Sequence, residues 1–329
     1  MILICGGLAD AVTELVCARL EACGYSYRLL DQRRYPAGYT VHWEWIGGRA
    51  EGTIAGPGWK VALDELTGVY ARYLPAEGRM PLPGVAEELL PGIYEEAESG
   101  LVALFEDLPC TVVNRMHGSI SNHSKPYQAM LIEECGLRSP ETLVTNDPAE
   151  AMAFFEETSG EVIYKSLSGI RSIVRRLSRE HWDRLPFLRQ GPAQFQRYVP
   201  GDNVRVHVVG DRIFPIRVRS EAVDYRYARQ EGHICEMSEE VLAPEVAEAC
   251  IRITRRLDLM FAGIDLKITP EGETFCFEVN PSPGFSFYEL GTGQPISAAL
   301  ADLLHATPTD LGAADRHHQP AVTHSVPGL

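Results

Sequence analysis

Carboxylate and amide side chains that suit a metal ion lie in two neighbouring apolar segments near the C-terminal end of the chain. Asp265 lies within residues 260–268, and Glu278 and Asn280 lie at the end of residues 274–280. Because side chains alternate along a strand, Glu278 and Asn280 point to one face, and a hairpin would bring Asp265 beside them. Two carboxylates and one amide oxygen suit Mg²⁺, so the pattern predicts a metal site. A solvated hairpin face is the alternative.

Two lysines upstream have surroundings that suit phosphate. Lys125 opens a helical pattern that runs to Cys135, and Lys165 ends the segment 161–165 before a loop of small residues. An ammonium group at such a strand end holds phosphate oxygens as a point charge. Together with the metal ligands, the lysines favour a nucleotide site.

Another segment that could serve a nucleotide site lies between the lysines and the metal ligands. Residues 195–199 precede a strand pattern that carries Arg205 and His207. These two side chains would point to the same face of the strand. We expect His207 to pack in the hydrophobic core or to support neighbouring site residues rather than to act in catalysis.

Farther along the chain, Asp224 and Arg226 form an Asp-x-Arg element. In chain order, the two lysines, residues 195–199 as a hinge segment, Arg205, Asp-x-Arg, Asp265 and Glu-x-Asn resemble the ATP-grasp ligases over about residues 110–305. Within that superfamily the chain is similar to the RimK-like branch, and more narrowly to the microviridin-type peptide macrocyclases, the graspetide synthetases. The narrower resemblance also rests on residues 31–36, on the hairpin after them and on Arg72 at a strand end.

The resemblance implies a mixed α/β (α+β) architecture, the ATP-grasp fold with an N-terminal Rossmann-like domain. We expect this pre-ATP-grasp domain over residues 1–118 and a central subdomain with a lid over residues 119–190. A C-terminal subdomain with the metal site would follow over residues 191–306, and residues 307–329 would form a flexible tail. The tail is polar and shows no periodicity.

The resemblance also implies roles for the site residues. ATP and Mg²⁺ are the implied cofactors, with Mn²⁺ as an alternative metal on the three oxygen ligands. Arg205 and Arg226 would stabilise charge in the reaction, and Asp224 would orient a group or act as a base. The residues implied in nucleotide binding are Lys125, Lys165, Gln196, Arg197, Tyr198, Val199, Asp202 and Asn203.

The chain departs from the family pattern at three points. Residues 166–173 contain one glycine where many relatives have a glycine-rich lid, which leaves the mobility of the lid open. Asn203 stands where an aspartate is usual, so the ribose contact falls either to Asp202 or to Asn203. Ala228 stands where an asparagine is frequent, which bears on substrate binding.

The implied reaction is the activation of a carboxylate by ATP. The carboxylate attacks the γ-phosphorus to give an acyl phosphate and ADP, and an amine or hydroxyl then displaces phosphate. We expect the products to be side-chain ester or amide crosslinks in a ribosomal precursor peptide. Two alternatives stay open: a ligase that joins an amino acid to a small molecule or to a protein terminus, and an ATP-binding scaffold without turnover.

The composition agrees with a cytoplasmic enzyme. The chain has 329 residues, of which 45% are hydrophobic, enough for two or three domains. It lacks a basic leader and any uncharged apolar stretch of about 18 residues, so we expect no membrane span. Its eight cysteines include no Cys-x-x-Cys pair, which favours reduced thiols over disulfides or zinc. A homodimer is compatible with all these features.

The charge balance bears on the binding partner. The chain has 30 basic and 45 acidic residues, a formal net charge of −15, which argues against general nucleic-acid binding. Between Lys165 and Arg197, however, basic residues face only Glu180 and Asp183 within the same segment. Such a segment would attract ATP, a precursor peptide with acidic residues or a small-molecule carboxylate. An ordinary solvated lid is the alternative.

Local patterns predict the elements that position these residues. Strands and helices alternate along the chain, which indicates α/β layers. A strand is expected over residues 1–5, followed by a helix that ends before Gly24. A hairpin is expected about Gly47 and Gly48, with Trp43 and Trp45 packed against the first domain. A further helix is expected from after Asp147 to residue 157. Three further helices are expected over about residues 85–105, 239–256 and 294–305.

Overall fold

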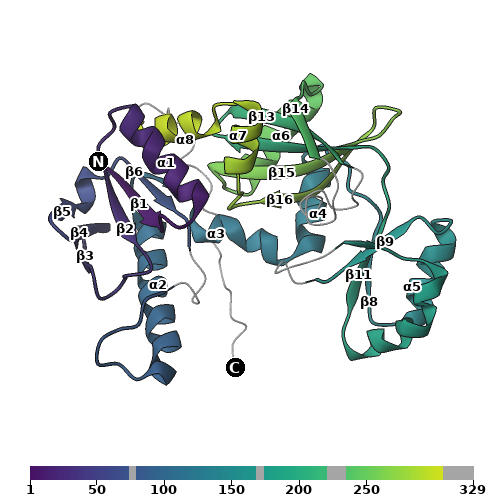
Figure 1. Ribbon diagram of the computed structural model, residues 1–329, viewed down its shortest axis with the longest axis horizontal. Coiled ribbons are helices and arrows are strands. Elements are labelled where there is room, and N and C mark those ends of the chain that lie inside the picture. Colours follow the sequence, from purple (N-terminus) through teal and green to yellow (C-terminus); the bar gives the residue numbers. More distant parts are fainter. Residues whose placement is uncertain (74–78, 168–173, 221–234, 307–329) are drawn as a thin grey trace, which may run out of the picture.

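The computed structural model describes residues 1–73, 79–167, 174–220 and 235–306. Asp224, Arg226 and Ala228, most of the segment 166–173 and the expected tail lie outside these described residues. The described residues form mixed α/β layers that include four sheets, with both α-helices and strands in each third of the molecule (Figure 1). The expected mixed architecture is confirmed.

Four parallel strands form the N-terminal sheet, in the order β2-β1-β6-β7. They are β1 (Ile2–Gly6), β2 (Tyr27–Asp31), β6 (Gly68–Ala71) and β7 (Thr111–Val113). β1 is buried along its whole length, as expected for a central parallel strand with both faces covered. α1 (Ala11–Ala22) and α8 (Ile296–His305) pack on one face, and α2 (Leu90–Asp107) packs on the other. The sheet is therefore of the Rossmann-like kind.

A small antiparallel sheet of β3 (Thr40–Ile46), β4 (Arg49–Gly56) and β5 (Trp59–Ala62) packs beside α2. The predicted turn is confirmed, because Gly47 and Gly48 have φ angles of 60° and 81° in the left-handed region that glycine favours. Trp43 packs against the hydrophobic cluster of this domain. Trp45 is 55% exposed, so the expectation that both rings pack inward is wrong for Trp45. It lies next to the turn, where the sheet is not covered.

The central sheet has the strand order β10-β9-β11-β8 and antiparallel pairing throughout. Its strands are β8 (Thr142–Thr145), β9 (Val162–Lys165), β10 (Arg175–Arg176) and β11 (Ala193–Arg197). α5 (Pro148–Glu157) packs on this sheet and begins as predicted, since Asp147 Oδ1 accepts a hydrogen bond from the N–H of Ala149 at 2.9 Å. The 3₁₀ segment η5 (Arg179–Gln190) covers the same face.

Five antiparallel strands form the C-terminal sheet, in the order β14-β13-β12-β15-β16. They are β12 (Asp202–Val209), β13 (Arg212–Ser220), β14 (Cys235–Glu239), β15 (Phe261–Ile268) and β16 (Thr274–Asn280). α4 (Lys125–Glu134) and α6 (Pro244–Arg256) bury one face of the sheet. α7 (Ser286–Thr292) and α8 bury part of the other face, together with α1 of the N-terminal domain. α8 thus joins the N-terminal and C-terminal sheets in one core (Figure 1).

Several helix boundaries differ from the prediction. α6 begins at Pro244 rather than near residue 239, because residues 235–239 pair with β13 and a proline suits the first helical turn. α8 begins at Ile296, directly after Pro295. The remaining short helical elements are η1 (Leu63–Glu65), η3 (Glu87–Leu89), α3 (Met116–Ser119) and η4 (Ile120–His123). Within the described ranges, no helix is both long enough and apolar enough to cross a bilayer.

Candidate active site

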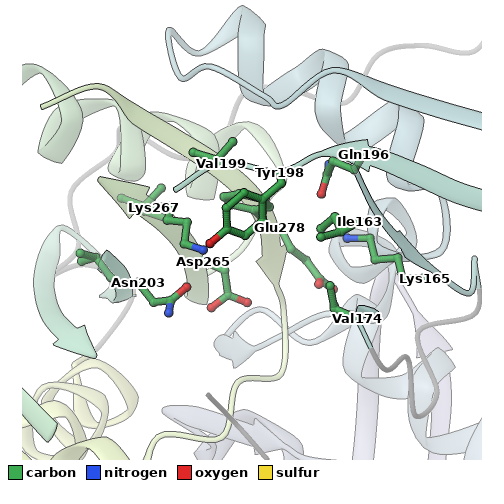
Figure 2. A pocket seen from close by; sticks show the side chains of 13 residues that line it. Ile163, Lys165, Val174, Gln196, Tyr198, Val199, Asn203, Asp265, Lys267 and Glu278 are labelled. Carbon is green, nitrogen blue, oxygen red and sulfur yellow. The ribbon is translucent and has the colours of Figure 1, made fainter. Parts of the chain in front are cut away.

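A cleft lies between the central sheet and the C-terminal sheet (Figure 2). Its walls come from β9 and β11 on one side and from β12, β15 and β16 on the other. Alternation along the strands selects which side chains face it, such as Ile163 and Lys165 but not Tyr164. The cleft is lined by Ile163, Lys165, Val174, Gln196, Tyr198, Val199, Asn203, Val204, Asp265, Leu266, Lys267, Phe277 and Glu278.

The three predicted metal ligands share one face of the β15-β16 hairpin. Asp265 lies directly opposite Glu278, and Asn280 lies opposite Gly263. Opposite residues of an antiparallel pair point to the same side of the sheet, so strand pairing brings the three together as the alternation predicts. A register shift between Asp265 and Leu266 leaves Phe277 as an extra residue on β16.

These side chains fit a magnesium ion by number and chemistry. Asp265 Oδ1 accepts a hydrogen bond from Arg205 Nη1 at 2.6 Å, and Asn280 Oδ1 accepts one from the N–H of Ser282 at 2.9 Å. A carboxylate has a second oxygen and an amide oxygen has a second lone pair, so both groups retain capacity for a metal. No three His, Cys, Asp or Glu side chains in the described residues are placed to hold a metal by themselves. Mg²⁺ suits this sparse set because it takes its other ligands from water and phosphate.

Arg205 is a buried cation beside the metal ligands. Its side chain is 7% exposed, and its guanidinium carbon lies 5.8 Å from the centre of the Tyr288 ring. Gly263 on the neighbouring strand leaves the space that the guanidinium occupies, because a Cβ there would lie 2.2 Å from Arg205 Nη2. The position of this charge therefore depends on a glycine in the next strand.

His207 lies two residues beyond Arg205 and is fully buried. Its ring packs among Phe261, Phe285 and Tyr288. Burial and then the positive charge of Arg205 hold the pKa of His207 well below its usual value, so the ring is neutral. This position in the core is the one that the sequence favours for His207.

Five of the eight residues implied in nucleotide binding line the cleft: Lys165, Gln196, Tyr198, Val199 and Asn203. Gln196 is buried and donates through Nε2 to Thr142 Oγ1 at 2.9 Å. Its Oε1 atom has no hydrogen-bond partner among the described residues. A buried acceptor without a partner in the wall of a cleft fits a ligand donor such as an adenine amino group.

The other three implied nucleotide residues do not line the cleft. Arg197 points away from it and pairs with Glu141 at 3.0 Å, because it alternates with Gln196 along β11. The carboxylate of Asp202 accepts hydrogen bonds from two arginines of β13, Arg217 and Arg219. Of the two residues proposed for the ribose, the structure therefore places Asn203 in the cleft and holds Asp202 in an ion pair.

Lys125 also lies outside the cleft, at the first residue of α4. The helix that it opens supports the metal hairpin in another way. Gln128 is buried, and its side-chain amide makes two hydrogen bonds of 2.9 Å with the N–H and the carbonyl of Val279. The free edge of β16 between Glu278 and Asn280 is thus paired by a side chain.

Lys267 lines the cleft but was not among the predicted site residues. It lies opposite Asn203, and its Nζ atom is 5.2 Å from the centre of the Tyr198 ring (Figure 2). Burial lowers the pKa of Lys267 from its ordinary value. The alternation that places Asp265 on the cleft face also places Lys267 there, two residues farther on, so the sequence carried this signal.

The basic segment 165–197 is less positive than its own sequence indicates. Arg176 pairs with Glu161 at 2.9 Å and lies over the Tyr198 ring at 3.5 Å, and Arg179 pairs with Glu156 at 2.9 Å. These acidic partners precede the segment in the chain, which is why counting charges within it missed them. Three arginines of the segment have no ion pair among the described residues: Arg175, Arg184 and Arg189.

A second hollow of about 210 Å³ lies on the opposite face of the central sheet. Its polar side chains include His181 and Arg184, and the Phe187 ring at its edge is 65% exposed. The remaining lining residues are Tyr164, Leu177, Leu185, Leu188, Gly191, Ala193 and Phe195. It is therefore an apolar groove with a cation beside it, separate from the cleft.

Comparison with known sequences identifies the family. Residues 123–304, more than half of the chain, match the RimK-like ATP-grasp domain. A probable alpha-L-glutamate ligase of Pseudoalteromonas translucida is 23% identical over 223 residues, which cover 64% of this chain and 73% of that protein. The N-acetylaspartylglutamate synthase A of Mus musculus is 24% identical over 227 residues, which cover 64% of this chain and 58% of that protein.

Solved structures share the fold along nearly the whole chain. The macrocyclase MdnC of Microcystis aeruginosa MRC, bound with precursor peptide MdnA, matches with a TM-score of 0.78 at 22% identity over 93% of this chain and 100% of that chain. The ATP-grasp ligase PsnB, complexed with minimal precursor, Mg and ADP, matches with a TM-score of 0.74 at 26% identity over 92% of this chain and 96% of that chain. The chain belongs to the RimK-like ATP-grasp family and is an ATP-dependent, ADP-forming ligase.

Proposed function

We propose that this ligase forms ester or amide crosslinks between side chains of a ribosomal precursor peptide. The observation that carries the proposal is the likeness to PsnB over 92% of the chain, including the N-terminal domain, at 26% identity. PsnB in that structure holds a peptide precursor together with Mg and ADP. The D-alanyl-alanine synthetase A of Vibrio cholerae matches 94% of the chain with a lower TM-score of 0.57. The likeness thus favours a peptide substrate.

In the proposed reaction, a carboxylate oxygen of the peptide attacks the γ-phosphorus of ATP. The bond between that phosphorus and the oxygen that bridges it to the β-phosphate breaks. ADP leaves, and the peptide carboxylate is now an acyl phosphate. A hydroxyl or amine of a second side chain then attacks the acyl carbon, gives up its proton and displaces phosphate. The peptide loses one water for each crosslink, and both steps need positive charge around the phosphoryl group.

Residues in the cleft and directly beside it are suited to supply that charge. Lys165 would hold phosphate oxygens, and Arg205 would stabilise charge that develops on the phosphoryl group. Arg205 suits this role because burial and the bond to Asp265 hold it in place before substrate binds. The ligands Asp265, Glu278 and Asn280 would hold Mg²⁺ or Mn²⁺, which neutralises phosphate charge when bound.

The base of the nucleotide would lie at the other end of the cleft. Gln196 would accept a hydrogen bond from the adenine amino group, and the backbone of Tyr198 and Val199 would meet the ring edge. Asn203 would contact the ribose. Asp224 and Arg226, outside the described residues, keep their proposed roles as an orienting group or base and as a second stabilising cation.

We assign the groove behind the central sheet to binding of the peptide away from its reacting residues. Its apolar wall suits a hydrophobic side chain, and Arg184 suits a neighbouring carboxylate. Arg184→Glu should therefore weaken the binding of an acidic precursor about tenfold at low salt, and less as salt screens the charge. Arg179→Glu is the matched control, since Arg179 pairs with Glu156 and does not line the groove. Equal losses in both variants would remove the groove from the proposal.

Mass spectrometry tests the proposed function directly. An acidic peptide with Ser, Thr or Lys side chains, encoded beside the enzyme, is incubated with enzyme, ATP and Mg²⁺. We expect a product that is lighter by one water per crosslink, formation of ADP and phosphate, and trapping of the activated carboxylate by hydroxylamine as a hydroxamate. An unchanged peptide mass in the presence of steady ADP formation would exclude crosslinking.

A second candidate is a ligase that joins a free amino acid to another molecule. The names of the curated relatives favour it, since they describe a glutamate ligase and an N-acetylaspartylglutamate synthase. This activity would add the mass of a residue to the acceptor instead of removing water. ATP turnover driven by a free amino acid alone would establish it in place of crosslinking.

A further inference from the structure

The loop of residues 281–284 directly follows Asn280, the last of the proposed metal ligands. Two residues of the N-terminal domain, Asn114 and Arg72, hold this loop at successive positions. Neither residue lines the cleft. Their partners are 167 and 210 residues away in the chain, so the contacts join separate parts of the fold.

Asn114 follows β7 and uses its whole side-chain amide to join that strand to the C-terminal sheet. Its Nδ2 atom donates to the carbonyl of Phe261 at 2.6 Å and to the carbonyl of Pro281 at 2.5 Å. Its Oδ1 atom accepts from the N–H groups of Met260 and Phe261 at 2.9 and 3.1 Å. An asparagine amide offers two donors and two acceptor positions, so these four contacts use its whole hydrogen-bonding capacity. The residue is also buried.

Arg72 follows β6 and connects the start of α1 to the same loop. Its Nε and Nη2 atoms donate to the two carboxylate oxygens of Asp10 at 2.7 and 3.3 Å, which orients the guanidinium plane. Its Nη1 atom then reaches the Oγ of Ser282 at 3.2 Å and the carbonyl of Ser282 at 3.4 Å. Asp10 is itself fixed, because it accepts the N–H of Thr13 at 2.9 Å as the cap of α1.

Ser282 carries this restraint to the metal end of the cleft. Its N–H donates to Asn280 Oδ1 at 2.9 Å, so the residue that Arg72 holds also orients the amide of Asn280. Asn114 holds the peptide between them, at Pro281. The side chain of Asn280 thus takes its direction from two contacts that begin in the N-terminal domain.

We infer that Arg72 and Asn114 are positioning residues for the metal ligand Asn280, and that the N-terminal domain tunes metal affinity through them. The inference rests on the proposed function, because it takes Asn280 as a metal ligand. Partners that orient metal ligands affect metal binding although they never touch the ion, typically by about 10 to 100-fold. Asn280 ends β16 directly before the loop, so its side chain gains from such support, because a loop left without these contacts would pay an ordering cost at each binding event.

The test compares the Mg²⁺ dependence of ADP formation in variants of the full chain. Arg72→Met should raise the free Mg²⁺ concentration for half-maximal rate about tenfold. Its affinity for ATP in the absence of metal should equal that of the parent. Arg72→Lys should restore part of the shift at most, because an ammonium cannot hold Asp10 through two parallel bonds and reach Ser282 as well.

Arg19→Met is the matched control. Arg19 also joins the N-terminal domain to the C-terminal part of the chain, by a 3.0 Å bond to Ser297 Oγ and a 3.5 Å ion pair with Glu289, but it does not touch the loop. We expect a lower unfolding temperature for Arg19→Met with an unchanged Mg²⁺ dependence. An equal Mg²⁺ dependence in the Arg72 and Arg19 variants would overturn the inference and reduce Arg72 to a structural contact.

Two further variants keep the inference open to refutation if Arg72→Met does not fold. Ser282→Ala removes one acceptor of Arg72 and keeps the N–H that binds Asn280, so a smaller shift of about twofold is expected. Asn114→Asp keeps both acceptor contacts and loses the donors to the carbonyls of Phe261 and Pro281, and should also raise the Mg²⁺ requirement. Parental Mg²⁺ dependence in both variants would refute the inference, whereas an unchanged peptide mass with steady ADP formation would refute the proposed crosslinking and leave the Mg²⁺ result unaffected.

Discussion

Arg205 and Asp265 lie directly opposite each other on β12 and β15, and the guanidinium of Arg205 donates to Asp265 Oδ1 at 2.6 Å. The arginine side chain is 7% exposed and the aspartate side chain 32% exposed. The pair joins the proposed catalytic cation to a proposed metal ligand. Because loss of one partner leaves the other charge unpaired in a poorly solvated place, we expect the two residues to act as one unit.

Glu278→Gln should abolish ADP formation while the fold persists. Glutamine has the same shape but no charge, and Glu278 lies at the end of a strand on the cleft face rather than in the core. ADP release and far-ultraviolet circular dichroism of the variant and the parent check this expectation. Turnover at the parental rate in a folded variant would contradict the assignment of the metal site.

Lys165→Met and Arg205→Met should separate binding from rate. Lys165 would contact phosphate in the ground state, so its loss should raise the KM for ATP by about tenfold or more. The charge of Arg205 is needed most as negative charge develops, so its loss should lower kcat by roughly 10²-fold to 10³-fold with little change in ATP affinity. Steady-state kinetics and direct nucleotide binding decide between the roles, and the opposite pattern in the two variants would reverse them.

Gly263→Ala should impair catalysis through Arg205. The added Cβ would lie 2.2 Å from Arg205 Nη2 and 2.6 Å from the Cβ of Pro283, so the guanidinium or the loop must shift. A displacement of about 1 Å in an active site can cost roughly 10²-fold in rate, which is the loss in kcat that we expect.

Gly92→Ala in α2 is the matched control for this substitution. An added Cβ at Gly92 has no atom within 4 Å, so activity should be unchanged and the helix slightly more stable. Equal kcat values for the two alanine variants would show that Gly263 does not position the guanidinium.

His117 should make the stability of the fold depend on pH. Its Nδ1 and Nε2 atoms contact Glu106 of α2 and Asp258 before β15. Partial burial opposes the protonated form, but the bonds to Glu106 and Asp258 outweigh it and raise the pKa of His117 above its ordinary value. The two contacts therefore stabilise the fold in full below the ordinary pKa of roughly 6.5, and the stabilisation is lost as pH rises through the higher folded-state value.

Denaturant unfolding of the parent and of His117→Gln tests this pH dependence. The parent should exceed His117→Gln in free energy of unfolding by more at about pH 5.5, where the imidazole is protonated, than at about pH 9, where it is neutral. A difference that does not vary between the two pH values would mean that His117 carries no charge in the fold.

The sequence by itself determined the features that depend on neighbours along the chain. Alternation along two strands predicted that Asp265, Glu278 and Asn280 share a face, and the hairpin of β15 and β16 brings them together. Paired glycines at Gly47 and Gly48 predicted a turn because few other residues tolerate positive φ at both positions. Such signals are local, so they do not depend on how distant segments pack.

Only the tertiary structure decided which polar groups are already occupied by distant partners. Asp202 and Asn203 are equivalent candidates in the sequence, but Arg217 and Arg219 hold Asp202, so Asn203 is the one in the cleft. Arg197 is likewise held by Glu141, 56 residues earlier in the chain. A hydrogen bond or an ion pair depends on distance in space, and for these residues that distance is decided by which strands pair and in which register.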